Sequence, residues 1–358
     1  MKIDIIIGTR PEIIKLYPII RALQRKNIEY RIIFTGQHYS NSLVKVFFDE
    51  LGLEPPDYRL DTGSGTHGKQ TAEILIGIEK IIAENRPDLV LIQGDTNTVL
   101  AGALAAAKLQ IDIGHVEAGL RSYDRSMPEE INRIVADHLS KYLFAPTVQA
   151  KENLMKEGIV KNVYVTGNTI VDTLYSCFEL LDKRNRLQEK YNIKSKEYFL
   201  ATLHRQENVD NKEKLTKIIN GLKQIVSYYN VPLLLPLHPR TKKMLEEFHI
   251  KTDRLGIIEP IGYLDFLMLE KNAKLILTDS GGVQEEACIM GTPCVTLRDN
   301  TERPETIEAG ANIIVGHEEQ KIIQGVREML ERKNNWKNPF GDGKSSKRIV
   351  DILMKNQQ

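Results

Sequence analysis

Polar and ionisable side chains recur in this sequence directly after apolar runs, at the points where predicted strands end. The residues in this position are Arg10, Asp95, Glu117, His204, His238 and Ser280. Ligands of an open parallel sheet bind at the carboxyl ends of its strands, so we expect these side chains to face a ligand cleft. Carboxylates and a histidine suit proton transfer near neutral pH, and an arginine suits an anionic group. A cleft enzyme is therefore favoured over a non-catalytic protein whose loops are merely polar.

Each candidate for proton transfer also has a structural alternative. Asp95 is either a catalytic carboxylate or the cap of the helix that follows it. Glu117 lies among small and apolar residues and is either functional or paired with Arg121 at helical spacing. His204 is the best single acid–base candidate, with a purely structural histidine as the alternative. Glu129 opens a predicted helix, where acids are favoured by the helix dipole, so its position alone decides nothing.

A glycine turn within residues 274–305 is suited to binding a phosphate. A short apolar run is followed by Ser280, Gly281 and Gly282, and then by a helical pattern. Paired glycines let backbone N–H groups approach a ligand, and the helix start adds positive partial charge. Glu285 and Glu286 are placed to accept hydrogen bonds from a sugar diol, and Arg303 adds charge nearby. The alternative is an ordinary connection in which glycine serves the turn and the acids serve the helix dipole.

The beginning of the chain offers a second anion site. Residues 3–7 predict a strand, and Gly8 and Pro11 lie in the turn to a helix, with proline suited to its first position. Arg10 and Lys15 are placed to clamp a diphosphate, although a solvated helix start explains them equally well.

Strand and helix patterns alternate along the whole chain. Strands are predicted at residues 3–7, 31–35, 88–93, 111–116, 142–145, 198–202, 232–237, 275–277 and 294–297. Helices are predicted at residues 11–23, near 42–51, and at 71–84, 99–108, 128–141, 172–190, 212–229, 283–290, 320–331 and 344–355. This alternation is typical of an α/β protein with two Rossmann-like, doubly wound parallel-sheet domains, which we place at residues 1–167 and 168–343 with a cleft between them.

Composition excludes several classes of partner. The 358 residues are 41% hydrophobic and 27% charged, as in a globular protein, and the net charge of +1 suits neither nucleic acid nor an anionic membrane. A strand pattern begins at Ile3 and apolar runs are short, so we expect neither a signal peptide nor a membrane span. The three cysteines lie in apolar sequence and the histidines are scattered. We expect reduced thiols, a cytoplasmic location and no metal site.

A set of short motifs gives the chain a family resemblance. The motifs are GTRPEIIK (8–15), GQH (36–38), QGDTNT (93–98), HVEAGLRS (115–122), PEEINR (128–133), TGN (166–168), HRQEN (204–208), TDSGGVQEEA (278–287) and RDNTERPE (298–305). In this order the chain resembles the bacterial and archaeal UDP-N-acetylglucosamine 2-epimerases of the non-hydrolysing type, over almost its whole length. Hydrolysing relatives share several of these motifs.

The resemblance implies a glycosyltransferase-B-like fold, with helix 344–358 packed back on the first domain. It implies reversible interconversion of UDP-N-acetylglucosamine and UDP-N-acetylmannosamine, by anti elimination of UDP and re-addition, with no cofactor. The implied catalytic residues are Asp95, Glu117, Glu129 and His204. The implied UDP-binding residues are Arg10, Lys15, Phe266, Ser280, Gly281, Gly282, Glu286 and Arg303, with Phe266 beside the uracil.

One segment departs from the family pattern. Bacterial members carry a second, activating UDP-N-acetylglucosamine site that involves the equivalents of Gln37, His38 and Gln70. These residues are present, but residues 63–69 look unlike the bacterial version, which leaves allosteric activation open. A UDP-sugar glycosyltransferase, a hydrolysing epimerase that releases N-acetylmannosamine and a non-catalytic nucleotide-sugar sensor are the alternatives. We expect UDP-N-acetylglucosamine and UDP as ligands and a homodimer as the assembly.

Overall fold

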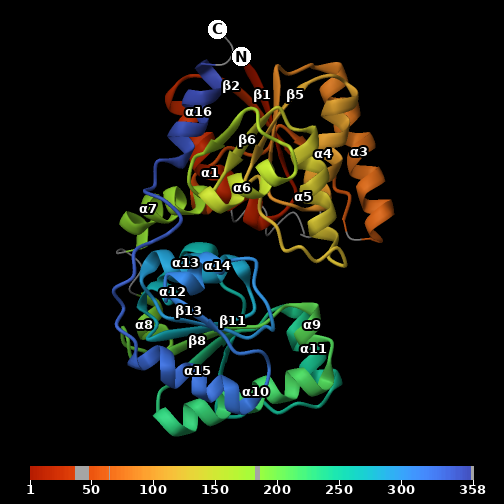
Figure 1. The fold of residues 1–358 in the computed structure, drawn as a ribbon. Helices are drawn as coiled ribbons and strands as arrows, with labels where there is room; N and C mark the ends of the chain where they lie inside the picture. The colour runs from red at the N-terminus through yellow and green to blue at the C-terminus, as the bar shows by residue number, and fades with distance from the viewer. Residues whose placement is uncertain (37–47, 64, 182–185, 356–358) are drawn as a thin grey trace. The chain divides into compact units, whose positions relative to one another are not determined.

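The computed structural model describes residues 1–36, 48–63, 65–181 and 186–355 of the chain. The chain divides into two compact units. The first unit comprises Met1–Ser176 together with Phe340–Gln358, and the second comprises Cys177–Pro339. In Figure 1 the first unit runs from red to yellow-green and regains the dark blue helix at the end of the chain, while the second is green to blue.

The first unit is built on a sheet in which seven described strands all run parallel, in the order β3-β2-β1-β4-β5-β6-β7. The strands are β1 (Lys2–Ile7), β2 (Glu29–Phe34), β3 (Tyr58–Arg59), β4 (Leu89–Gln93), β5 (Asp112–Val116), β6 (Tyr142–Ala145) and β7 (Val163–Val165). The helices are α1 (Arg10–Arg25), α3 (His67–Glu84), α4 (Asn97–Lys108), α5 (Pro128–Leu139), α6 (Val148–Lys156), α7 (Thr169–Leu181), which runs on into the second unit, and α16 (Ser345–Lys355). The order of the strands reverses between β1 and β4, which makes this pair a topological switch point.

Small residues allow α4 to pack closely on this sheet. The helix reads NTVLAGALAAAK, and four of its five alanines are buried: Ala101, Ala103, Ala105 and Ala106. A Cβ added at Gly102 would lie 2.8 Å from Ile6 Cδ1, so only glycine fits at this approach. The close packing fixes α4, and with it the turn that precedes the helix, against β1 and β4.

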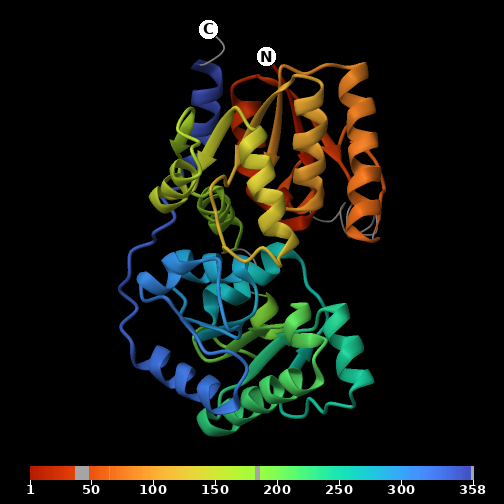
Figure 2. The ribbon, with the colours of Figure 1, turned by 45° about the vertical axis from the view of Figure 1, so that its right-hand side comes forward.

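The second unit repeats the plan with six described parallel strands, in the order β10-β9-β8-β11-β12-β13. The strands are β8 (Phe199–Thr202), β9 (Leu233–Pro236), β10 (Gly256–Ile258), β11 (Leu275–Thr278), β12 (Cys294–Thr296) and β13 (Asn312–Ile314). The helices, seen from a second side in Figure 2, are α8 (Arg186–Lys190), α9 (Gln206–Val209), α10 (Lys212–Tyr229), α11 (Pro239–Glu247), α12 (Tyr263–Asn272), α13 (Gly281–Met290), α14 (Pro304–Glu308) and α15 (Glu319–Glu331). Here the switch point lies between β8 and β11.

The last helix of the chain, α16, packs against α1 in the first unit. Its start is capped by Asp172 of α7, whose carboxylate accepts the N–H groups of Ser345 at 3.1 Å and Ser346 at 2.8 Å. Lys26, directly after α1, forms an ion pair with Asp351 of α16. The first unit is therefore closed by a segment from the far end of the sequence.

The α/β class and the two doubly wound parallel sheets are confirmed, but the shortest elements escaped the sequence patterns. The missed strands are β3, β7, β10 and β13, which are the four edge strands of the described sheets. Each has only two or three residues, too few for a periodic signal. Residues 172–190, expected as one helix, contain α7 and α8. Residues 42–47 of the helix expected near 42–51, and residues 182–185, lie outside the described residues.

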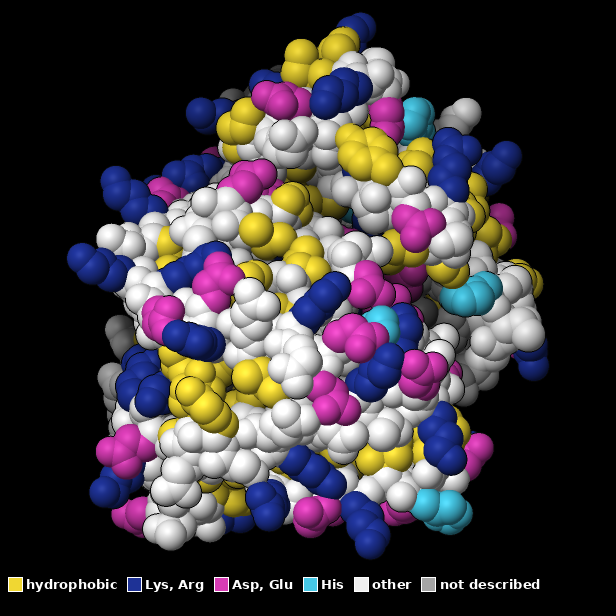
Figure 3. Space-filling view, turned by 60° about the horizontal axis from the view of Figure 1, so that its bottom comes forward, with side chains coloured by type: hydrophobic (Ala, Val, Ile, Leu, Met, Phe, Trp, Pro, Cys, Tyr) yellow, Lys and Arg dark blue, Asp and Glu magenta, His cyan; other side chains and the backbone are white. Residues whose placement is uncertain are grey.

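Surface charge and helix hydropathy bear on possible partners. On the face drawn in Figure 3, lysine and arginine side chains are interspersed with aspartate and glutamate. Within the described part of the chain, we find no helix that combines the length and the apolar character needed to cross a membrane.

Candidate active site

The first unit brings Lys15, Gln93 and Glu117 together at its switch point. Lys15 lies in the first turns of α1, Gln93 ends β4, and Glu117 directly follows β5. Lys15 Nζ is 2.6 Å from Glu117 Oε1, and Gln93 Nε2 donates to Glu117 Oε2. The Lys15 and Glu117 side chains are 8% and 6% exposed, so the pair is almost fully buried. Glu117 is thus held as an oriented, ionised carboxylate at the carboxyl edge of the sheet.

The backbone at Glu117 explains why its partner is not Arg121. Glu117 has a φ of 70°, in the left-handed region, so the chain turns sharply here and does not continue as a helix. Arg121 instead contacts Asp137 at 2.7 Å and Glu157 at 2.6 Å. The alternative of a Glu117–Arg121 pair at helical spacing is therefore wrong.

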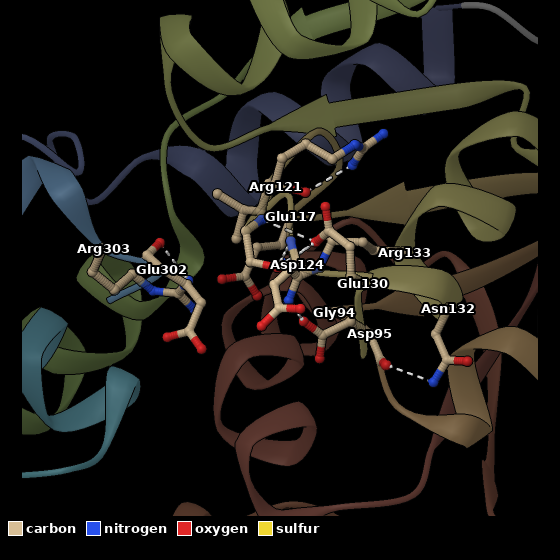
Figure 4. A network of polar contacts seen from close by, with 12 residues as sticks. Gly94, Asp95, Glu117, Arg121, Asp124, Glu130, Asn132, Arg133, Glu302 and Arg303 are labelled. Atoms are coloured by element: carbon tan, nitrogen blue, oxygen red, sulfur yellow. Dashed lines mark hydrogen bonds and ion pairs between the residues drawn. The ribbon is translucent and has the colours of Figure 1, made fainter. Parts of the chain in front are cut away.

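Asp95 is held by α5 and does not cap the following helix (Figure 4). Arg133 Nη2 donates to its carboxylate, and Asn132 Nδ2 donates to its backbone carbonyl at 2.9 Å. The N-cap of α4 is the next residue, Thr96, whose hydroxyl accepts from the Val99 N–H at 3.4 Å. The capping alternative for Asp95 is wrong, and its side chain is 31% exposed and reachable by a ligand.

The two acids that open α5 have different surroundings. Glu130 is buried and accepts the N–H groups of Ser122 at 2.9 Å and Tyr123 at 3.0 Å, as well as Arg133 Nη1 at 2.8 Å. It therefore fixes the loop that follows Glu117. Glu129, the predicted catalytic residue, is half-buried, and among the described residues none donates a hydrogen bond to it.

Glu12 is a buried carboxylate that the sequence candidates did not include. It accepts the N–H groups of Gly8 and Thr9 and, at 2.5 Å, the hydroxyl of Thr96, so it ties the β1–α1 turn to the β4–α4 turn. Burial raises the pKa of Glu12 to about 7. The hydrogen bonds from Thr96, Gly8 and Thr9 oppose that rise in part, and the nearby charge of Asp95 adds to it. The sequence did carry a signal for this role of Glu12, because Thr9 and Glu12 in GTRPE have the spacing of a capping box at a helix start.

In the second unit, His204 follows β8 and is oriented by Asp279, which follows β11. His204 Nδ1 is 3.1 Å from Asp279 Oδ1, and the other carboxylate oxygen accepts the N–H groups of His204 and Arg205, both at 3.0 Å. Burial would raise the pKa of Asp279, but the contacts with His204 and with the backbone N–H groups lower it below its ordinary value. An ionised Asp279 holds a proton on Nδ1 and leaves Nε2 of the 38% exposed His204 to act as acid or base.

His238 lies beside His204, with 5.8 Å between the ring centroids. Burial lowers the pKa of His238, and the neighbouring His204 lowers it further. His238 Nδ1 accepts the Arg240 N–H at 3.2 Å, which assigns the proton of the neutral ring to Nε2. The second histidine therefore presents a donor at the same sheet edge.

The glycine turn expected to bind a phosphate begins α13. Ser280 is the N-cap of this helix, Gly281 and Gly282 are its first residues, and Gly282 is exposed. A Cβ on Gly281 would have Glu302 Oε2, 3.7 Å away, as its nearest neighbour among the described residues. The glycines thus leave room for a ligand beside the N–H groups of the helix start, as a phosphate site requires.

The other predicted UDP-binding residues have specific partners in the second unit. Arg303 forms an ion pair of 2.7 Å with Glu285, which is 1% exposed. Tyr263 donates its hydroxyl to Glu286 Oε1 at 3.0 Å. Phe266 is half-buried on α12, the helix that carries Tyr263. In the first unit, Arg10 is half-buried at the start of α1.

Of the residues expected at an allosteric site, only Gln70 can be described, because Gln37 and His38 lie outside the described residues. Gln70 is buried in α3, where its amide nitrogen donates to the Gly63 carbonyl at 2.6 Å and its oxygen accepts from Asn97 at 2.9 Å. The side chain thus links the loop before α3 to the start of α4.

Sequence reasoning missed the side chains that hold the candidates in place. They are Gln93, Asn132, Arg133 and Asp279. Asp279 follows a strand, as the selected residues do, and Arg133 belongs to the PEEINR motif, so both carried a usable signal. The structure also shows no cluster of three or more His, Cys, Asp or Glu side chains suited to a metal among the residues it describes.

Two doubly wound sheets, each with ionisable groups at the carboxyl edge of a switch point, define a protein of the glycosyltransferase-B-like α/β class. The family model described as UDP-N-acetylglucosamine 2-epimerase matches residues 21–354. The chain belongs to the UDP-N-acetylglucosamine 2-epimerase family, which confirms the resemblance seen in its motifs.

Relatives in this family match the chain from end to end. It is 59% identical over 361 residues to the UDP-N-acetylglucosamine 2-epimerase of Methanocaldococcus jannaschii, with 99% of each chain covered. It is 52% identical over 360 residues to that of Methanococcus maripaludis, with 98% of each covered. The crystal structure of the M. jannaschii UDP-GlcNAc 2-epimerase in complex with UDP-GlcNAc and UDP has a TM-score of 0.93 to this fold and covers 99% of this chain and 100% of that one.

Proposed function

We propose that this chain interconverts UDP-N-acetylglucosamine and UDP-N-acetylmannosamine by moving the proton at C2 of the sugar, without releasing free sugar. The observation that carries the proposal is 59% identity over the full length to an epimerase whose structure holds UDP-GlcNAc and UDP. The gathering of Asp95 and Glu117 at one switch point, and of His204 and Ser280 at the other, supports it.

The second unit would bind the UDP moiety. The N–H groups at Ser280, Gly281 and Gly282 suit the diphosphate, because the start of α13 supplies donors and positive partial charge. Arg303, held by Glu285, adds a full positive charge. Two further residues complete the proposed contacts: Glu286 at the ribose and Phe266 beside the uracil.

The first unit would supply most of the proton-transfer groups. A base must be ionised before it can accept a proton, and Glu117 and Asp95 each lie beside a cation, Lys15 and Arg133 respectively, which favours the ionised form. Together with Glu129, these are the carboxylates proposed to act at C2. Lys15 keeps a second proposed role beside Arg10 at the diphosphate, because its ammonium group carries a full positive charge.

The reaction we propose has two stages. One group removes the C2 proton while UDP leaves from C1 with its diphosphate charge stabilised, which forms a C1–C2 double bond. UDP then adds back to C1, and a proton returns to C2 from the opposite face. His204, with Nδ1 held by Asp279, is the proposed partner of the carboxylates in these proton transfers.

Incubation with UDP-N-acetylglucosamine alone in heavy water tests the proposal. We expect UDP-N-acetylmannosamine that carries deuterium at C2 and, by reversal, deuterium in the remaining substrate. Free N-acetylmannosamine with UDP would support the hydrolysing alternative instead. Transfer of the sugar to an added acceptor would support a glycosyltransferase, and binding without conversion would support a sensor.

Assembly and regulation are tested separately. We infer that the chain is cytoplasmic and that it forms a homodimer. Light scattering of the purified chain checks the dimer by its mass. A sigmoidal dependence of the rate on UDP-N-acetylglucosamine would support the activating site that the resemblance associates with Gln37, His38 and Gln70.

A further inference from the structure

A fully buried histidine lies in the strand that leads to Glu117, one of the proposed proton-transfer groups. His115 belongs to β5, two residues before Glu117, and its side chain is 0% exposed. Its Nδ1 is 2.7 Å from Asp137 Oδ1, and its Nε2 is 2.8 Å from the backbone carbonyl oxygen of Gly94. An ionised carboxylate and a carbonyl accept hydrogen bonds and donate none. Both ring nitrogens must therefore donate, which describes an imidazolium.

The surrounding charges agree with a positive ring. Asp137 is fully buried, and its Oδ2 accepts Arg121 Nη1 at 2.7 Å and the Gly119 N–H at 3.2 Å. Burial would raise the pKa of Asp137, but the charges of His115 and Arg121 lower it below its ordinary value, so the carboxylate is ionised. Arg121 also pairs with Glu157 at 2.6 Å. With a charged His115, this connected set holds two cations and two anions and is balanced.

His115 connects the turns that carry Asp95 and Glu117. The carbonyl it contacts belongs to Gly94, which has a φ of 82° and directly precedes Asp95. The Gly94 N–H donates to the Val116 carbonyl at 3.1 Å, immediately before Glu117. His115 therefore fixes the carbonyl of the turn after β4, and the Gly94 N–H ties that turn to the end of β5.

We propose that His115 is a positioning residue that donates from both ring nitrogens and holds Asp95 and Glu117 in register by bridging Asp137 to the Gly94 carbonyl. The inference rests on the proposed function of these two carboxylates. His115 does not reach the substrate and exchanges no proton during turnover. A neutral ring of either tautomer would set a bare nitrogen against an acceptor and lose one of the two contacts.

The charge state is tested without any enzymatic assay. The whole chain, labelled with nitrogen-15 in histidine, is followed by nuclear magnetic resonance from about pH 6 to about pH 9, a range in which an ordinary histidine loses its charge. We expect one ring, assigned by its loss in His115→Gln, to keep the imidazolium pattern throughout. A ring that titrates, or one that shows a neutral tautomer, would overturn the proposal whether or not the chain is an epimerase.

The positioning role is tested by kinetics on the same variant. Glutamine can donate to one acceptor but carries no charge, so we expect His115→Gln to lower kcat by about 10- to 100-fold, with KM and UDP affinity almost unchanged. The pH profile should keep its shape, because no titrating group of the reaction is removed. His138→Gln, an exposed histidine on α5, is the matched control and should behave as the parent.

The experiments distinguish a failure of the proposed function from a failure of the proposed role of His115. If the parent chain is inactive on UDP-N-acetylglucosamine, the proposed function fails and the resonance experiment still decides the charge of His115. If the parent is active, loss of one limb of the pH profile in His115→Gln would make His115 a titrating participant and overturn the proposal. Unchanged kcat in the folded variant would overturn it as well. If His115→Gln does not fold, Asp137→Asn provides the second variant, with the same expected change in kcat and unchanged UDP affinity.

Discussion

Lys15 and Glu117 form a buried ion pair that joins α1 to the turn after β5, with 2.6 Å between Nζ and Oε1. Removing one charge leaves the other buried without compensation, so Lys15→Met should lower the free energy of unfolding by about 3–5 kcal/mol. Lys15→Met/Glu117→Leu should recover much of that loss, because both charges are then absent. Urea denaturation of the single and double variants measures the coupling.

An exposed pair provides the control for this experiment. Lys69 and Glu73 lie 3.7 Å apart on α3, with side chains 71% and 45% exposed. Lys69→Met should therefore change the free energy of unfolding by less than about 0.5 kcal/mol. Equal effects of Lys15→Met and Lys69→Met would contradict the assigned burial of the Lys15–Glu117 pair.

Glu12 should make stability depend on pH near neutrality. Its pKa is raised from 4.5 to about 7 in the folded chain, so the folded state binds this proton more tightly than the unfolded state. The stabilisation that results is complete below the ordinary pKa and is lost as the pH rises through about 7. Between about pH 5 and about pH 8.5 the parent should lose roughly 2–3 kcal/mol relative to Glu12→Gln, which has no such proton.

Chemical denaturation at a series of pH values measures this difference. Glu79→Gln, at an exposed position of α3, is the control and should run parallel to the parent at all pH values. A parallel course for Glu12→Gln as well would show that Glu12 titrates as an ordinary carboxylate.

Asp279 should affect catalysis through His204 and leave nucleotide binding intact. Asp279→Asn keeps an oxygen for the backbone N–H groups but loses the charge that orients the His204 ring. We expect turnover to fall by on the order of 10²-fold or more, as for other histidines that lose an orienting carboxylate. Calorimetry should give nearly unchanged UDP affinity. Asp253→Asn, which removes an exposed partner of Lys223, is the control, and parental turnover in folded Asp279→Asn would refute the role.

Gly281→Val should weaken UDP binding without unfolding the chain. A Cβ added at Gly281 has Glu302 Oε2, 3.7 Å away, as its nearest neighbour, so circular dichroism should show a folded chain. It nevertheless occupies the space beside the first N–H groups of α13, and UDP affinity should fall by roughly tenfold or more. Gly68→Val on α3, where the new Cβ meets nothing within 4 Å, should leave UDP affinity unchanged. Unaltered UDP affinity in Gly281→Val would remove this turn from the proposed site.

The central strands and the turns after them could be predicted from sequence because both signals are local. A continuous apolar run such as β4 or β11 indicates a strand buried on both faces. The polar residue that follows is then assigned to the carboxyl edge of the sheet. Asp95, Glu117, His204 and Ser280 all lie at these edges, as expected.

The partners of these residues could not be predicted, because pairing depends on contacts that are distant in sequence. Lys15 and Glu117 are 102 residues apart, and they meet only because β1, β4 and β5 are neighbours in register. The alternative of a Glu117–Arg121 pair assumed a helix, but the backbone at Glu117 is left-handed and Arg121 contacts Asp137. Asp95 and Thr96 are both good capping residues, and only the position of Arg133 decides between them.

The position of α16 has a consequence for how the chain is made. Synthesis on the ribosome delivers residues 1–176 first, then the whole of the second unit, and only then the segment that packs on α1. The second unit is contiguous in sequence, so it can complete its fold while the first unit still lacks α16, the helix whose start Asp172 caps. The face of α1 that receives α16 therefore stays uncovered by α16 until residues 345–355 have been synthesised, so the unit that is synthesised first is the later one to be completed.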